Sequence, residues 1–151
     1  MRVVVDADSC PVKQEIVSTA HRFEVSVLMV ASFNHRLVES EGVSVVRVDS
    51  SSQSADLFIA NHISSGDIVV TQDYGLAALA IAKCCDVLSP RGESYDTGNI
   101  DYLLERRHEK AKARRAGKHS KGPKPFSDED REQFQQKLTK LLEQRQETKQ
   151  I

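Results

Sequence analysis

The chain has 151 residues, of which 39% are hydrophobic, which suits one globular domain with a sizeable core. No apolar run approaches the roughly 20 residues that a membrane helix needs, and Asp6 and Asp8 stand where a signal peptide would be apolar. We therefore expect neither a membrane-spanning nor an exported protein. The three cysteines, Cys10, Cys84 and Cys85, form no disulfide framework and lack zinc-site spacing, which favours a cytoplasmic protein.

The net charge of −1 conceals an uneven distribution of charge along the chain. Residues 1–101 carry seven Lys and Arg against 14 Asp and Glu, residues 102–125 carry nine against two, and residues 126–151 carry five against six. An acidic body joined to a basic segment is typical of proteins that handle a polyanion near a cation site. A solvated basic linker without a ligand is an equally good interpretation of the charge alone.

The first part of the chain alternates short β-branched runs with helical stretches, as in a parallel sheet covered by helices. The continuous apolar run of Val3, Val4 and Val5 predicts a central strand that is buried on both faces. Asp8 or Ser9 can cap a helix over about 11–22. The pattern predicts further strands at 24–31, 43–48, 68–71 and 86–89, helices over about 55–63, 76–82 and 100–108, and an irregular segment at 94–98.

The composition changes after His108. Residues 109–125 contain two glycines, two prolines and many Lys and Arg, which predicts a basic mobile linker. Ser127 and Asp130 resemble a capping box, and an apolar stripe of a helix follows at Phe134, Leu138, Leu141 and Leu142. The predicted organisation is thus an α/β domain over 1–108, the linker and a C-terminal amphipathic helix over 126–151. That helix packs either on its own domain or on a second copy, which would make a homodimer.

Aspartates gather where the predicted strands end. Asp6 and Asp8 follow the first strand, Asp49 the third and Asp73 the fourth, and Asp56 begins the helix before the fourth. The carboxyl ends of parallel strands meet at one edge of a sheet, where α/β proteins bind ligands. Grouped carboxylates repel one another unless a cation lies among them, and oxygen ligands suit Mg²⁺ or Mn²⁺. The pattern therefore predicts metal-assisted attack of water on a phosphate group.

Each acid also has a structural interpretation. Asp8 and Asp73 can be helix caps and Asp49 a turn residue, so the prediction depends on their joint position. Asp6 is the exception, because an aspartate beside a buried central strand is costly without a partner. Asp67 precedes its strand and is expected at the opposite edge of the sheet.

Several short motifs occur in a fixed order along the chain. They are VDADSCPVK at 5–13, AD at 55–56, GDIVVTQD at 66–73, PRG at 90–92, NI at 99–100 and GPKPF at 122–126. In sequence and order they resemble the bacterial YaiI/YqxD family, an uncharacterised family related to the PIN and NYN nuclease-like domains. The resemblance covers nearly the whole chain. It implies a three-layer α/β/α, PIN-like fold with a mostly parallel central sheet and an acidic metal pocket.

The resemblance also implies roles for individual acids. Asp6, Asp56 and Asp73 match the first three acids of PIN domains, and Asp8 is the partner of Asp6 in the family's own doublet. The fourth PIN acid has no evident counterpart after Asp73, where Tyr74-Gly75-Leu76 follows. The substitutes open to the chain are Asp8, Asp96 and Asp101. The expected catalytic and metal-binding residues, with Mg²⁺ or Mn²⁺ as cofactor, are Asp6, Asp8, Asp56 and Asp73.

Basic residues are the candidates for holding a nucleic acid backbone. The selected residues are Arg91, Arg106, Arg107, Lys110, Arg114 and Arg115, with Lys13, Asn34 and Asn99 as secondary candidates. The segment 106–124 contains no Phe, Tyr or Trp to stack on a base, so we expect phosphate contacts without sequence readout. The leading hypothesis is a cytoplasmic, Mg²⁺ or Mn²⁺ dependent nuclease that acts on RNA.

Other functions remain open at this point. One is a non-catalytic nucleic-acid-binding protein, and another is an adaptor that uses its final helix. Asp6 and Asp8 also resemble the first motif of haloacid dehalogenase-type phosphatases, but Asp67 and Asp73, which mimic the last motif, flank a strand instead of following it together. Cys10 at a helix start is a candidate reactive thiol, with a small packed residue as the favoured interpretation.

Overall fold

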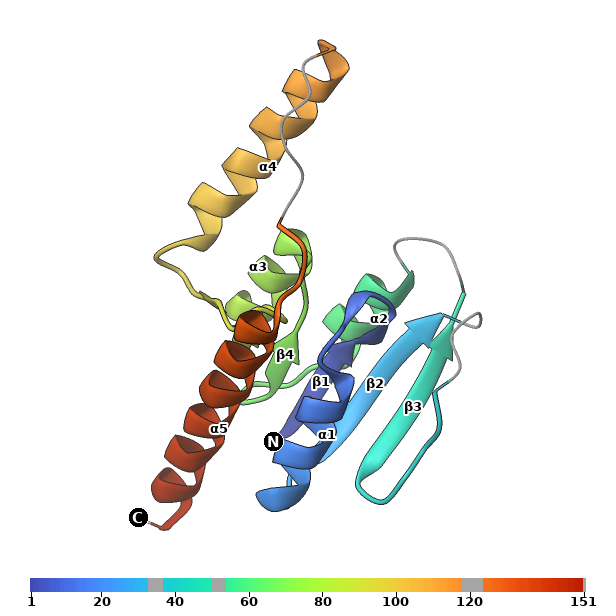
Figure 1. The fold of residues 1–151 in the computed structure, drawn as a ribbon, viewed down its shortest axis with the longest axis vertical. Coiled ribbons are helices and arrows are strands. Elements are labelled where there is room, and N and C mark those ends of the chain that lie inside the picture. Colours follow the sequence, from blue (N-terminus) through green and yellow to red (C-terminus); the bar gives the residue numbers. More distant parts are fainter. Residues whose placement is uncertain (33–36, 50–53, 118–123, 151) are drawn as a thin grey trace.

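The computed structural model describes residues 1–32, 37–49, 54–117 and 124–150 (Figure 1). Its centre is a six-stranded sheet in the order β3-β2-β1-β4-β5-β6. All neighbouring strands are parallel except β5 and β6, which are antiparallel. The strands are β1 (Arg2–Asp6), β2 (Ser26–Ser32), β3 (Val43–Val48), β4 (Ile68–Val70), β5 (Asp86–Leu88) and β6 (Ser94–Tyr95).

Helices cover both faces of this sheet. On one face lie α1 (Lys13–Arg22) and α5 (Asp128–Gln150), whose apolar side chains share a core with Val3 and Val5. On the other lie α2 (Ser54–His62), α3 (Tyr74–Ala82) and α4 (Ile100–Arg115), whose apolar side chains share a core with Val4. The result is the expected three-layer α/β/α fold with a mostly parallel sheet. Within the described residues, no helix is both long and apolar enough to cross a membrane.

The central position of β1 follows from its sequence. Successive side chains of a strand point to opposite faces, so an uninterrupted run of valines supplies apolar groups to both cores. Val3, Val4 and Val5 are at most 1% exposed. The prediction of a strand buried on both faces is confirmed, and Asp6 is thereby fixed at its carboxyl end.

The C-terminal helix packs on its own domain. Its predicted capping box is present, because the Asp130 amide donates to Ser127 Oγ at 3.2 Å and the Ser127 amide donates to Asp130 Oδ2 at 3.1 Å. Phe134, Leu138 and Leu142 are fully buried in the core that α1 and the sheet share. This stripe is therefore occupied within the chain, and a homodimer through the helix stays a prediction.

Three boundaries differ from those expected. Residues 109–115, assigned to a linker, continue α4, because alanines and long charged residues favour helix and the break comes only at Gly117, with φ +81°. The segment expected to be irregular contains β6, whose Tyr95 pairs with Val87 of β5. The helix expected from 11 begins at Lys13, and its N-cap residue makes no side-chain cap hydrogen bond.

Candidate active site

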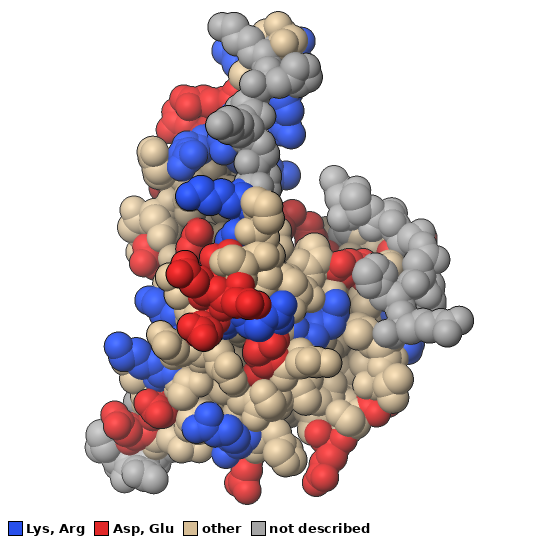
Figure 2. Space-filling model, in the orientation of Figure 1, with Lys and Arg blue, Asp and Glu red and all other residues tan. Residues whose placement is uncertain are grey.

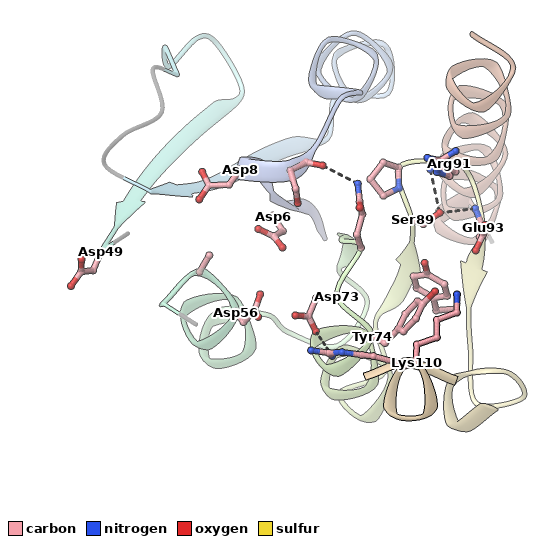
Figure 3. A pocket seen from close by; sticks show the side chains of 16 residues that line it. Asp6, Asp8, Asp49, Asp56, Asp73, Tyr74, Ser89, Arg91, Glu93 and Lys110 are labelled. Atoms are coloured by element: carbon pink, nitrogen blue, oxygen red, sulfur yellow. Dashed lines mark hydrogen bonds and ion pairs between the residues drawn. The ribbon is translucent and has the colours of Figure 1, made fainter. Parts of the chain in front are cut away.

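A pocket of about 720 Å³ opens at the carboxyl ends of the parallel strands (Figure 3). All four acids selected from the sequence line it. In Figure 3 the side chains of Asp6, Asp56 and Asp73 point toward one another from three different elements, while Lys110 lies on the opposite side, toward β5. The charged residues that line the pocket are Asp6, Asp8, Asp49, Asp56, Asp73, Glu93, Arg91, Arg107 and Lys110.

Thr71 connects two of these acids. Its hydroxyl donates to Asp6 Oδ2 at 3.2 Å and accepts from the Asp73 amide at 3.0 Å. Because Thr71 directly follows β4 and is 1% exposed, it holds the ends of β1 and β4 in a fixed relation. Burial raises the pKa of Asp6, the Thr71 hydrogen bond lowers it, and the charges of Asp8 and Asp73 raise it further.

Asp73 has both a structural and an electrostatic role. Its Oδ1 accepts from the Leu76 amide at 2.9 Å, so it is the N-cap of α3, as the structural interpretation predicted. The same oxygen lies 3.8 Å from Nη1 of Arg107, which reaches in from α4. Capping therefore does not remove this carboxylate from the pocket.

Asp56 lies on the first turn of α2 and faces the other two acids. Burial raises its pKa to about 7, with further increases from the charge of Asp73, a hydrogen bond to Asp73 and the charge of Asp6. Arg107 acts in the opposite direction. Burial and the neighbouring negative charges thus both disfavour the ionised form of this carboxyl group.

Asp8 does not cap α1. Its two oxygens accept from the Ser32 amide at 2.9 and 3.2 Å, which ties the turn after β1 to the end of β2. The Ser32 main-chain amide, at the end of β2, therefore donates its hydrogen bond to a side chain. Asp8 also lines the pocket, beside Asp6.

The chemistry of the donor set fits Mg²⁺ or Mn²⁺. Aspartate oxygens suit these hard cations. Burial and then mutual repulsion raise the pKa values of Asp6 and Asp56, and a cation would relieve that repulsion. Among the residues with described placement, no three His, Cys, Asp or Glu side chains already converge at metal-ligand spacing. Mg²⁺ binds through only one or two carboxylates and keeps several water ligands, so a preformed cage is not required.

The substitutes proposed for a fourth acid separate clearly. Asp8 lines the pocket, as does Asp49. Asp96 instead closes a turn, where its Oδ1 accepts from the Gly98 amide at 2.8 Å and the Asn99 amide at 3.1 Å. Asp101 is exposed on α4 and is not part of the pocket lining.

The basic candidates divide between the pocket and its surroundings. Arg107 and Lys110, both on α4, line the pocket. Arg106 is one residue away but lies over the ring of Tyr102, 5.9 Å from its centroid. Arg114 and Arg115 are exposed on the last turn of α4.

Arg91 lines the pocket but is engaged with the start of α5. Its Nη1 lies 2.8 Å from Asp130 Oδ2, its Nη2 donates to the carbonyl of Lys124, and its guanidinium lies 5.7 Å from the ring centroid of Phe126. The next residue, Gly92, has φ +87°, and a Cβ there would lie 2.9 Å from the α5 backbone. This motif therefore has a structural explanation in the docking of α5.

The two secondary candidates with described placement, Lys13 and Asn99, lie outside the pocket lining. Lys13 borders a separate, mostly apolar hollow between α1 and β3. Asn99 holds the turn before α4, because its Nδ2 donates to the Ser94 carbonyl at 2.9 Å and its Oδ1 accepts from the Asp96 amide at 3.0 Å. Asn34 falls outside the described residues.

The sequence analysis did not identify the residues that line the pocket next to β5. Tyr74 and Tyr95 meet edge to face with ring centroids 5.5 Å apart, and both line the pocket. The Ser89 hydroxyl accepts from the amides of Arg91 at 3.2 Å and Glu93 at 3.1 Å, which shapes the turn between β5 and β6. The glycine turn followed by Ser94-Tyr95 is the signal that would have indicated this hairpin.

Two alternative chemistries find no support in the geometry. Burial raises the pKa of the Cys10 thiol to about 11, so the thiolate needed of a nucleophile is disfavoured. Asp67 directly precedes β4 and is 4% exposed. Its carboxylate accepts hydrogen bonds from the amides of Ser64 at 2.8 Å and Arg2 at 3.2 Å. It therefore lies at the edge opposite Asp73, as expected, and the two cannot act together as a phosphatase motif.

The pKa of Asp56 predicts a pH dependence of stability in metal-free buffer. An unfolded Asp loses its proton near 3.8 and folded Asp56 near 7, so between these values the folded state binds more protons. The contribution of Asp56 to stability is therefore complete below about pH 4 and lost as the pH rises to about 7. Urea unfolding with EDTA should show Asp56→Asn gaining stability over wild type across this window, and a constant difference would contradict the assignment.

The fold and the pocket define an α/β/α protein with an acidic site at the carboxyl ends of parallel strands. The chain belongs to the YaiI/YqxD family, because residues 4–144 match the family described as "Uncharacterized BCR, YaiI/YqxD family". UPF0178 protein BH1374 of Halalkalibacterium halodurans is 48% identical over 143 residues, which cover 95% of this chain and 91% of that protein. UPF0178 protein RBAM_023530 of Bacillus velezensis is 50% identical over 141 residues, which cover 93% and 84%.

Among solved structures, the chain is similar to the crystal structure of Rae1 (YacP) from Bacillus subtilis. The TM-score is 0.43 and the sequence identity 19%, over 95% of this chain and 99% of that chain.

Proposed function

We propose that the protein is a Mg²⁺ or Mn²⁺ dependent phosphodiesterase that hydrolyses RNA. One observation carries the proposal: carboxylates from β1, α2 and the β4–α3 junction face one another in a pocket that basic side chains of α4 also line. Phosphodiester hydrolysis needs both features, a cation site and positive groups for the phosphate. RNA is proposed as the substrate because the family resembles the PIN and NYN nuclease-like domains.

Each part of the pocket has a task in this proposal. Asp6, Asp56 and Asp73 would surround the cation, one or two of them as direct ligands and the others through its water ligands, with Asp8 beside them. A bound cation would supply an activated water and neutralise charge on the attacked phosphate. Arg107 and Lys110 would hold the non-bridging phosphate oxygens. The Arg107 guanidinium lies 3.8 Å from Asp73, so a phosphate held beside that carboxylate would be within its reach.

The same ion pair favours a second candidate function. Arg107 already places a positive charge beside Asp73, and an arginine that neutralises an acidic pocket is compatible with a nucleic-acid-binding protein without catalysis. Binding of a divalent cation separates the two functions, because only the enzyme requires it.

The test is a Mn²⁺ titration by calorimetry, followed by an assay on labelled single-stranded RNA and on DNA of the same sequence. We expect saturable binding of Mn²⁺ and cleavage of RNA that requires Mn²⁺ or Mg²⁺ and stops in EDTA. Binding without cleavage of either nucleic acid would overturn the assignment of substrate. If Mn²⁺ did not bind at all, the proposal of a metal-dependent enzyme would be wrong, and the non-catalytic nucleic-acid-binding protein would be favoured.

A further inference from the structure

Helix α4 changes its surroundings halfway along its length. In its first two turns, Ile100, Leu103 and Leu104 pack with α3 in the core that contains Val4. From Glu105 to Lys110 and again at Arg114 and Arg115 the side chains are exposed, and the helix projects from the body (Figure 1). The outer half of α4 is therefore not held in place by a core of its own.

Three basic residues of α4 lie on one side of the helix, whereas three acids and Lys112 lie on the other. Residues three, four and seven apart share one side of a helix, so Arg107, Lys110 and Arg114 continue the side on which Leu103 packs. Two of these basic residues line the pocket, which fixes the direction of that side. The acids Asp101, Glu105 and Glu109, spaced four apart, fall on the opposite side.

This basic face, defined as Arg107, Lys110 and Arg114, is a continuous extension of the pocket wall. A helix rises about 1.5 Å per residue, so the face is about 10 Å long, roughly three phosphate spacings of a stacked strand. Figure 2 shows Lys and Arg side chains along the projecting part of α4. The spacing suits a linear polyanion that leaves the pocket along α4.

Hydrogen bonds and ring contacts hold the chain before the start of α4 and after the projecting segment. Before α4, the Asn99 side chain bridges Ser94 and Asp96. Before α5, Arg91 contacts the chain at the carbonyl of Lys124 and the ring of Phe126. The orientation of α4 at the pocket is therefore set by the turn at Asn99 and by the packing of Leu103 and Leu104.

We propose that the basic face of α4 guides one nucleic acid strand into the acidic pocket, so that the substrate is a polynucleotide and not a small phosphoester. This inference rests on the proposed function and adds to it a binding surface outside the pocket, which a polynucleotide can reach and a small phosphoester cannot. The three basic residues of the basic face would hold a polyanion on the pocket side of the helix, through phosphate contacts without base readout.

The test compares two charge reversals on the full chain. Arg114→Glu changes the basic face beyond the pocket lining, and Lys112→Glu makes the same change in charge on the acidic side of the same helical region. Both residues are exposed, so both variants should unfold at the wild-type temperature to within a few degrees. Affinity for a fluorescent 12-nucleotide RNA is measured in EDTA, where hydrolysis cannot interfere.

We expect Arg114→Glu to weaken binding about tenfold and to reduce the salt dependence by about one phosphate contact, while Lys112→Glu changes affinity less than twofold. Equal losses in both variants would overturn the proposal, because they would indicate unspecific attraction. Competition by polyglutamate as effective as that by RNA would overturn it in favour of an acidic protein partner. Failure of the metal and cleavage tests would leave this binding result unaffected, so the two proposals fail separately.

Discussion

Asp6→Asn should reduce RNA cleavage at least about 100-fold while making the metal-free protein more stable. The two effects have one cause. Asp6 is held in a partly buried site beside Asp8 and Asp73, where burial and these neighbouring charges raise its pKa. Asparagine keeps the shape of the side chain and can still accept a hydrogen bond from Thr71. It removes the charge that would bind a cation, and with it the repulsion from Asp8 and Asp73 that destabilises the metal-free protein.

Calorimetry and urea unfolding measure the two halves of this prediction. Affinity for Mn²⁺ should fall about 100-fold or more, and the midpoint of unfolding in EDTA should rise. Asp101→Asn is the matched control, since it makes the same chemical change at an exposed position outside the pocket lining. If Mn²⁺ affinity were unchanged in Asp6→Asn, the proposed metal site would be wrong. Cleavage that persisted in this variant would contradict the role proposed for Asp6.

Gly92→Ala should be the most destabilising of the substitutions considered, by about 2–4 kcal/mol. At φ +87° any Cβ is strained, and here it would also lie 2.9 Å from Gln133 C and Phe134 N. These are backbone atoms of a helix and cannot rotate away as a side chain would. To relieve the clash, α5 must move off the sheet and take the buried Phe134 with it.

Gly42→Ala separates the two contributions. Gly42 has a similar φ of +77°, but a Cβ there would meet nothing within 4 Å. We expect it to cost only about 1 kcal/mol, the conformational part of the effect. Urea unfolding of both variants gives the comparison. Equal losses would show that the approach of α5 to Gly92 is not tight.

The sequence was informative where one requirement determined the pattern. A run of three valines needs two apolar faces, and so β1 could be placed at the centre and Asp6 at its end. The other acids followed because each stands near the end of a strand or the start of a helix. Local capping was visible too, in Ser127 with Asp130.

The sequence was uninformative where two patterns compete or where distant segments meet. Residues 109–115 have a composition typical of a linker and of a solvated helix, and the helix is the outcome. Arg91 was selected as a phosphate ligand because its charge is evident, whereas its partners Lys124, Phe126 and Asp130 lie more than thirty residues away. Tyr74 and Tyr95 meet only because β6 turns back along β5.

The docking of α5 has a consequence for how the protein folds. Phe134, Leu138 and Leu142 share a core with Ile16 and Val3, residues more than a hundred positions earlier in the chain. Contacts over such separations slow folding, because a long loop must close before they form. Since α5 is synthesised after every strand it covers, the part of that face which α1 does not cover remains apolar and open on the nascent chain. Until α5 emerges, that face is a surface for chaperones or for aggregation.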